Sequence, residues 1–301
     1  MDKHLKTLEF DKVLEELAKF TDFELTKNKI FKLRPTSDIN KLHKQFLMSD
    51  EMKNVLRLNL SLPLNKLYDI FQPINDLKYK RTLSIESLIH LACELKTSRL
   101  VKSFFAKYQK DFENLFCFTS NLFSDKELED EIFNTFDDKM NVVDEASMEL
   151  RNLRNQKRSF EQNIKDTISS LLTNPNFNKY LQNDIVTTRD GRSAFLVKAE
   201  NKNKIDGIIL DASSSLQTYY IEPKELVTLN NKLRNIEIEI NKEIEKILFS
   251  LSQKIEPFTL EIERNSNILV ELDFIYAKAK YSHKFDLCTP QFVKEKIINL
   301  K

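Results

Sequence analysis

The sequence predicts a mainly α protein with a small antiparallel β insert: a helical core plus a long antiparallel coiled-coil lever that carries a β-rich clamp tip. Only 2 glycines and 7 prolines occur among 301 residues, too few for the turns of a many-stranded protein or a doubly wound sheet. Two apolar stripes with a heptad-like period flank a short segment whose apolar residues change to a period of two. That segment holds both glycines of the chain.

Residues 1–138 are predicted to form the helical core domain, to which residues 257–301 return. From residue 5 to about residue 123 apolar residues recur at helical spacing, as at Leu88, Leu91 and Leu95. Residues 34–38 offer a proline stop followed by capping residues, and 62–63 and 72–73 are interpreted as turns. The acidic residues 124–138 are interpreted as a solvated face and the first turn of the next helix, rather than as catalytic carboxylates or a metal site.

The outgoing lever helix is predicted at 139–182 and the returning lever helix at 223–256, which Pro223 opens and Pro257 closes. Each narrow stripe needs a partner, and the simplest solution is for the two to pair antiparallel. The alternative is that each helix belongs to an ordinary bundle. The stripes consist of Val143, Ala146, Leu150, Leu153, Phe160, Ile164 and Leu171, and of Leu226, Leu229, Leu233, Ile236, Ile240, Ile247 and Leu251.

The β-rich segment is predicted at 183–222, with strands at 185–189, 193–199, 205–211 and 216–222. Asp190 and Gly191 separate the first two strands, and this dipeptide tolerates the positive φ angles of a tight hairpin turn. Residues 212–215 join the second pair. Because four short strands alone bury little apolar surface, we expect them to pack against the ends of the two helices.

Composition excludes several classes of protein. The 47 basic and 46 acidic residues nearly cancel, so any nucleic-acid-binding surface must be local. Three scattered cysteines do not make a disulfide framework and favour a reducing, cytoplasmic location. No apolar run is long enough for a signal peptide or a membrane span, so no membrane partner is expected.

Several segments resemble the type-two branch of the bacterial MutS family, in family order and over nearly the whole chain. The clamp and returning lever of that branch are similar to DGRSAFLVKAENKNKIDGIILDASSSLQTYYIEPKELVTLNNKLR. Its opening helices resemble LEFDKVLEELAKFTDFELTKNKIFKLRPTSD, its outgoing lever VDEASMELRNLRNQKRSFEQNI, and its return to the core LDFIYAKAKYS. In this sequence Leu210 and Leu216 stand where the family usually has histidine and glycine, so the turn at the tip is expected to differ.

The resemblance implies a homodimeric ATPase and possible endonuclease that acts in DNA repair, mismatch binding and control of homologous recombination, or in rescue of collided ribosomes. This chain has no G-x-x-x-x-G-K-[ST] phosphate loop, and Gly191 and Gly207 cannot supply one. We therefore expect no catalytic residue and no cofactor here, with ATP and magnesium confined to a missing ATPase domain. The C-terminal nuclease-like domain is also absent, and we expect a truncated form of the protein.

What remains is a lever and clamp that contact DNA or ribosomal RNA without sequence preference. Residues 184–222 carry five basic and six acidic residues, but the cations gather at loop ends where phosphates can reach them. A basic stripe on the outgoing helix can line a nucleic-acid channel or simply flank a charged coiled coil. The candidate nucleic-acid-binding residues are Arg189, Arg192, Lys198, Lys202, Lys204, Arg151, Arg154, Lys157 and Arg158.

Other candidate sites are weaker. The four histidines lie far apart in the sequence, with no cysteine or carboxylate at metal-ligand spacing, so no metal is expected. Tyr219 and Tyr220 can stack on an unpaired base, but neighbours in a strand point to opposite faces, so one of them should pack inward. The alternative function is a structural coiled-coil arm that binds a protein and no nucleic acid.

Overall fold

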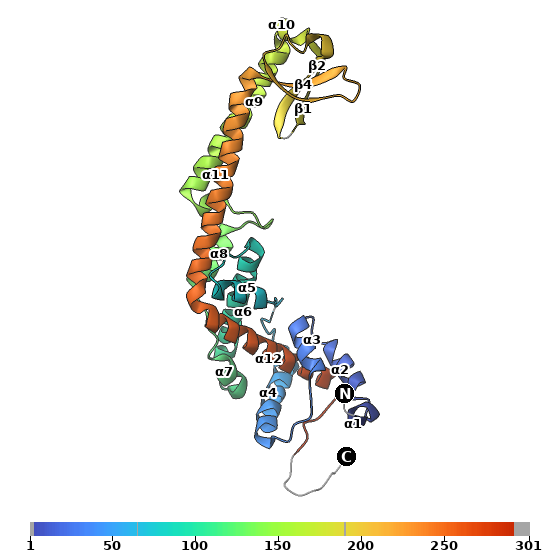
Figure 1. The fold of residues 1–301 in the computed structure, drawn as a ribbon. Coiled ribbons are helices and arrows are strands. Elements are labelled where there is room, and N and C mark those ends of the chain that lie inside the picture. Colours follow the sequence, from blue (N-terminus) through green and yellow to red (C-terminus); the bar gives the residue numbers. More distant parts are fainter. Residues whose placement is uncertain (1–2, 65, 190, 292–301) are drawn as a thin grey trace. The chain divides into compact units, whose positions relative to one another are not determined.

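The computed structural model describes residues 3–64, 66–189 and 191–291, which divide into two compact units. The first unit combines the chain up to Asn141 with the chain from Leu248 onward, and the second unit is Val142–Ile247. Figure 1 shows the elements of both, coloured along the sequence. The described chain is mostly helical and contains a four-stranded antiparallel sheet, which confirms the predicted fold class at this level.

The first unit is built from helices. The N-terminal stretch supplies α1 (Lys3–Thr7), α2 (Phe10–Ala18), α3 (Glu24–Phe31), α4 (Ile39–Arg57), α5 (Phe71–Lys78), α6 (Ile85–Lys107), α7 (Glu113–Thr119) and α8 (Lys126–Thr135). The C-terminal stretch supplies the last turns of α11 (Lys224–Ile255), the short 3₁₀ helix η3 (Glu256–Phe258) and α12 (Thr259–Lys284). No helix among the described residues is both long and apolar enough to cross a membrane.

Side-chain caps fix several helix starts in the first unit. The Asp38 carboxylate accepts a hydrogen bond from the Lys41 amide at 3.0 Å, as the predicted stop-and-cap sequence requires. Asp125 accepts from the Leu128 amide at 3.0 Å, so the acidic stretch does open a helix, with Glu127 and Glu129 in its first turn.

The predicted turn at 72–73 is wrong, because Pro73 lies inside α5. The helix begins at Phe71, which places Pro73 in its first turn. Backbone N–H groups of a first turn have no intrahelical acceptor, so a proline there removes no hydrogen bond and its fixed φ suits a helix. Proline therefore marks the start of this helix and not a break in it.

Helix α12 is buried on two sides and organises the core of the first unit. Leu272 and Ile275 belong to a cluster with residues of α4, α6 and α7, including Met52 and Phe105. Phe274 and Ala277 belong to a second cluster with residues of α2 and α3, including Leu17. Because a helix with two buried sides has no wide polar stripe, its amphipathic pattern in the sequence is weak.

The second unit contains the sheet and the facing segments of two long helices. Its elements are η1 (Asp144–Ala146), α9 (Met148–Thr173), α10 (Pro175–Asn178), β1 (Leu181–Arg189), β2 (Arg192–Lys198), η2 (Ala199–Asn201), β3 (Gly207–Ala212), β4 (Thr218–Pro223) and α11 up to Ile247. The sequence pattern places Val143 and Ala146 at the start of the outgoing apolar stripe, but both precede α9. Ser147 follows η1, and its hydroxyl caps α9 by accepting from the Leu150 amide at 3.0 Å.

Within this unit α9 and α11 lie side by side and run in opposite directions (Figure 1). Near the start of α9, the Ser147 hydroxyl donates to Glu243 at 2.8 Å. Further along, Lys157 pairs with Glu237 at 2.9 Å. Toward its end, Ile164 joins an apolar cluster with Leu226, at the start of α11. Residue numbers fall along α11 as they rise along α9, so the two stripes face each other antiparallel.

The sheet has the strand order β1-β2-β4-β3, with every neighbouring pair antiparallel. The two predicted hairpins are present as β1–β2 and β3–β4, and β4 pairs with β2 to join them. Gly207 begins β3, where a Cβ atom would lie 2.3 Å from the Glu222 carbonyl oxygen. The approach of these two backbones therefore requires glycine.

One face of the sheet packs on the two helices. Phe195, Val197 and Ile221 form a cluster with Ile164 and Leu226, which agrees with the expectation that the strands pack on the helices. At the first hairpin, Arg189 pairs with Arg192, and Gly191 has a φ of 76°. The predicted two-residue turn includes Asp190, which lies outside the described residues.

Candidate nucleic-acid interface

Arg192 is held inside the second unit. Its guanidinium donates to Glu222 at 2.7 Å and also to Asn231 on α11. Glu222 is fully buried, and the side-chain amide of Asn230 donates to its other oxygen at 2.7 Å. A buried carboxylate needs both charge and hydrogen-bond partners, so Arg192 joins the sheet to α11 and is not free to grip a phosphate.

Arg189 reaches across the sheet from its edge strand. The guanidinium carbon lies 4.3 Å from the centroid of the Tyr220 ring on β4. Its Nε lies 3.8 Å from Asp211 on β3, and the arginine and aspartate side chains are 44% and 54% exposed. An ion pair this exposed is weak, so the charge of Arg189 remains accessible to a competing anion.

Three lysines lie at the opposite end of β2 and in the segment that follows it. Lys198 ends β2 and is exposed, and Lys204 is exposed in the connection to β3. Lys202 is partly covered, and its ammonium group lies 4.8 Å from the centroid of the Tyr219 ring. Within the described chain, none of the three forms an ion pair. Their ammonium groups are therefore available to phosphate oxygens.

The cations predicted on the outgoing helix are mostly paired. Arg154 and Arg158 both bind Asp144, with nitrogen–oxygen distances of 2.6 and 3.3 Å. The pKa of Asp144 lies below its usual value, chiefly because Arg154 donates a hydrogen bond to its carboxylate and further because Arg158 does so. Lys157 pairs with Glu237 across the two helices. Only Arg151, which is exposed, has no ion-pair partner among the described residues.

The structure thus divides the nine predicted residues by availability. Arg154, Lys157 and Arg192 form ion pairs inside the unit. Arg189 and Arg158 also form ion pairs, but their side chains are exposed. The remaining cations are exposed or only partly covered and carry no ion pair within the described ranges: Arg151, Lys198, Lys202 and Lys204. Sequence reasoning missed the partners Asp144, Glu222 and Asn230, which lie 8 to 30 residues from the groups they bind.

The loop between β3 and β4 contains a strained residue. Leu216, at the position where the resemblance placed glycine, has a φ of 56° and a side chain that is 63% exposed. Its amide donates to the Ser213 carbonyl at 2.8 Å, which closes the turn. The backbone therefore adopts the left-handed conformation that glycine favours, although leucine occupies the position.

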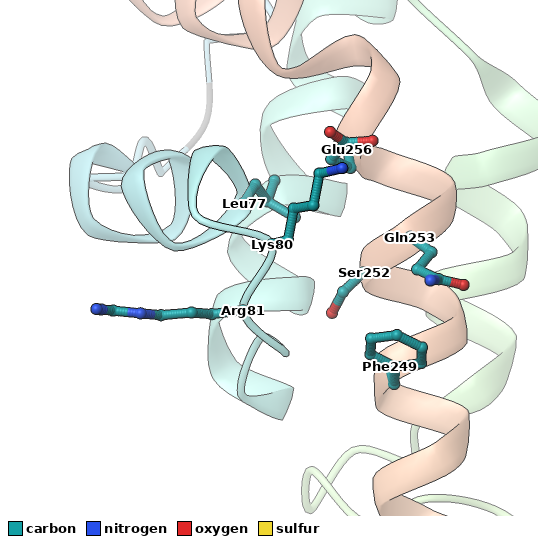
Figure 2. A pocket seen from close by; sticks show the side chains of 7 residues that line it. All are labelled: Leu77, Lys80, Arg81, Phe249, Ser252, Gln253 and Glu256. Atoms are coloured by element: carbon teal, nitrogen blue, oxygen red, sulfur yellow. The ribbon is translucent and has the colours of Figure 1, made fainter.

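A cavity of about 440 Å³ in the first unit offers no comparable cluster of functional groups. In Figure 2 the Lys80 side chain reaches toward Glu256, whereas Arg81 extends away from the other side chains. Arg81 is paired with Asp76 at 3.2 Å. Over the residues that the structure describes, no group of three or more histidine, cysteine, aspartate or glutamate side chains is arranged to hold a metal ion.

Comparison with curated proteins gives relatives that match nearly the whole chain. It is 34% identical to endonuclease MutS2 of Ligilactobacillus salivarius over 302 residues, which cover 99% of this chain. It is 34% identical to endonuclease MutS2 of Caldanaerobacter subterraneus over 100% of its length, and 31% identical to that of Clostridium botulinum strain Okra over 99%. Over its matched length the chain belongs to the MutS2 family.

The match covers only part of each relative. The chain spans 38% of the length of each of these three MutS2 proteins. No protein-family model matches it. The MutS2 relationship therefore covers the helical unit and the sheet-bearing unit described above, and the functions of the whole relatives do not transfer to this chain by identity alone.

Proposed function

We propose that this chain is a non-catalytic part of a MutS2-type protein, in which α9 and α11 form a lever and the four-stranded sheet forms a clamp. The clamp contacts the phosphate backbone of nucleic acid without sequence preference. The observation that supports this most is the group of cations without ion pairs in the described chain, Lys198, Lys202 and Lys204, together with the exposed Arg189. Cations of this kind release counterions when they bind phosphates, whatever the base sequence.

The MutS2 relationship suggests the kind of target. We propose branched or mismatched DNA, or ribosomal RNA of stalled ribosomes, contacted in the cytoplasm during repair, recombination control or ribosome rescue. ATP, magnesium and dimerisation would belong to other parts of a longer protein. The relatives carry the name endonuclease, but this chain spans 38% of their length, and we propose no nuclease residue within it.

Binding across a salt series tests the proposal. A labelled four-way DNA junction is titrated with the chain between low and moderate salt, and the logarithm of the binding constant should fall linearly with the logarithm of the salt concentration. A triple variant, Lys198→Ala, Lys202→Ala and Lys204→Ala, should weaken binding and reduce the slope by about 0.9 for each phosphate that is no longer neutralised. Binding that does not depend on salt would contradict the proposed contacts between the clamp and the phosphates.

A matched variant controls for net charge. Lys41, Lys44 and Lys110 are exposed in the first unit, so replacing all three by alanine removes the same charge elsewhere. This control variant should bind the DNA junction with nearly the affinity of the unsubstituted chain, because only cations close to the phosphates release counterions. An equal weakening in both variants would mean that general charge, and not the clamp, attracts the DNA.

A second function has its own support. Arg154 and Arg158 bind Asp144 just before α9, and Lys157 binds Glu237 on α11, so these cations are used inside the unit, as expected for a structural arm that binds a protein. Under this alternative the triple lysine variant would stay folded and keep the same affinity for nucleic acid.

A further inference from the structure

The strand register assigns each side chain of the sheet to one of two faces. Val186, Phe195 and Ile221 occupy the face that packs on α9 and α11. Residues one position away along each strand occupy the opposite face, called here the outer face. From the strand pairings, the outer face consists of Thr187, Arg189, Arg192, Ala194, Leu196, Lys198, Ile208, Asp211, Thr218, Tyr220 and Glu222.

Part of the outer face is covered. Arg192 and Glu222 reach side chains of α11, and Ala194 is fully buried. The open part of the face therefore lies beyond these residues, toward Leu196 and Tyr220 on β2 and β4.

The two tyrosines of β4 point in opposite directions. Tyr219 packs with the apolar cluster on the helix side, and Tyr220 lies on the outer face opposite Leu196. Both Tyr220 and Leu196 are only partly covered, and Ile208 on the same face is 45% exposed. These three partly exposed side chains, on the central strands β2 and β4 and on the edge strand β3, form an apolar surface.

Arg189 completes this surface with a planar cation. It comes from the edge strand β1 and crosses β2 to lie over the Tyr220 ring, 4.3 Å from its centroid. Asp211, from the other edge strand, approaches its Nε at 3.8 Å. The guanidinium is thus held against an aromatic ring, with 44% of its side chain exposed. Guanidinium planes and aromatic rings are the two groups on which proteins stack unpaired bases.

We propose that the outer face binds single-stranded nucleic acid, with an unpaired base stacked on the Arg189 guanidinium that Tyr220 supports. Lys198, exposed on the same face at the end of β2, contacts a phosphate of the same strand. Of the two acids on this face, Glu222 is buried and Asp211 already faces Arg189, so neither is a free charge that repels a phosphate. This inference rests on the proposed function and narrows its target to nucleic acid with unpaired bases.

Stacking predicts a preference that phosphate contacts alone do not produce. A base inside a duplex has both its faces covered by neighbouring bases, so it cannot reach the guanidinium. The chain should therefore bind a single-stranded oligonucleotide more tightly than the duplex of the same sequence. A 2-aminopurine placed in the single strand should lose fluorescence on binding, because this base is quenched when it stacks.

Tyr220→Leu tests the role of the aromatic ring, and Arg189→Lys tests the role of the guanidinium that lies over it. Tyr220→Leu removes the ring and should weaken single-strand binding by about tenfold, the effect typical of one stacked base, with no change in salt slope. Tyr220→Phe keeps the ring and is the matched control. Arg189→Lys keeps the charge but not the plane, and should also abolish the fluorescence change. Circular dichroism checks that each variant is folded, and Arg189 is exposed enough to be replaced without disturbing the core.

The outcomes separate this inference from the proposed function. Quenching that disappears in Tyr220→Leu and in Arg189→Lys but persists in Tyr220→Phe supports it. Equal binding of single strand and duplex, with unchanged affinity in Tyr220→Leu, overturns it and leaves the proposed phosphate contacts of the clamp intact. If the unvaried chain binds neither oligonucleotide, both are overturned.

Discussion

Glu94 lies in the middle of α6 with 3% of its surface exposed, and its Oε1 atom has no hydrogen-bond partner among the described residues. Burial raises the pKa of this carboxyl group to about 8. A carboxylate without a partner is costly to bury, so the group stays protonated at neutral pH. The neutral acid is tolerated among the apolar residues of α6, but it makes the first unit sensitive to pH.

The sign of that sensitivity follows from the direction of the pKa change. The native state binds the proton more tightly than the unfolded state, so the contribution of Glu94 to stability is fully present below pH 4.5 and is lost as pH rises to about 8. The decrease attributable to Glu94 is on the order of 5 kcal/mol. Glu94→Gln should remove this part of the pH dependence, measured by urea unfolding at several pH values. An unchanged pH dependence in the variant would contradict the assignment.

Leu216 is a second residue in an unfavourable setting, in this case because of its backbone conformation. Its φ of 56° is unfavourable for a residue with a Cβ atom, and its side chain is 63% exposed, so little packing compensates. Leu216→Gly should stabilise the second unit by about 1 kcal/mol, less the greater entropy that glycine has in the unfolded chain. Thermal unfolding measures the change. Leu216→Ala, which removes the side chain but keeps the strain, should give no such gain, and equal gains in both variants would count against this explanation.

At the scale of single elements, the sequence predicts well where apolar period and chain punctuation agree. The sheet is predictable because the apolar period changes to two around the chain's 2 glycines. Each glycine has its own reason: Gly191 has a positive φ in the hairpin, and Gly207 lies against the Glu222 carbonyl. The paired stripes are predictable because a narrow apolar stripe is most simply buried against one partner helix.

Other features of the elements are not predictable from local pattern. Val143 and Ala146 fit the heptad period, yet both lie before the first residue of α9. The Ser147 cap decides where the helix begins, and the apolar period continues N-terminal to it only by chance. Pro73 is misread as a turn because a proline in a first helical turn and a proline in a loop look alike in the sequence. The availability of each cation depends on acids distant in sequence, as for Arg192 and Glu222, and composition does not reveal such pairs.

At the scale of the whole molecule, the chain divides into a helical unit and a sheet-bearing unit that α11 joins covalently. The N-terminal and C-terminal stretches meet in the first unit through α12, whereas the second unit is one continuous stretch. A continuous stretch inserted into a host unit can form its own core and leave the host core intact. The proposed clamp therefore depends on the pairing of α9 with α11 and not on the core of the first unit.

Cross-linking between α9 and α11 tests the proposed antiparallel lever most directly, because it reports which residues of the two helices face each other. After Cys93, Cys117 and Cys288, which are all free thiols, are replaced by serine, cysteines are introduced in pairs and oxidised mildly. Ser147→Cys with Glu243→Cys should form a disulfide faster than the shifted pairs, since the native side chains of these two residues are in contact, with the Ser147 hydroxyl 2.8 Å from the Glu243 carboxylate. Pairs shifted by one helical turn, Ser147→Cys with Glu239→Cys or with Ile247→Cys, should cross-link far more slowly. Faster cross-linking of a shifted pair, or none at all, would contradict the antiparallel arm.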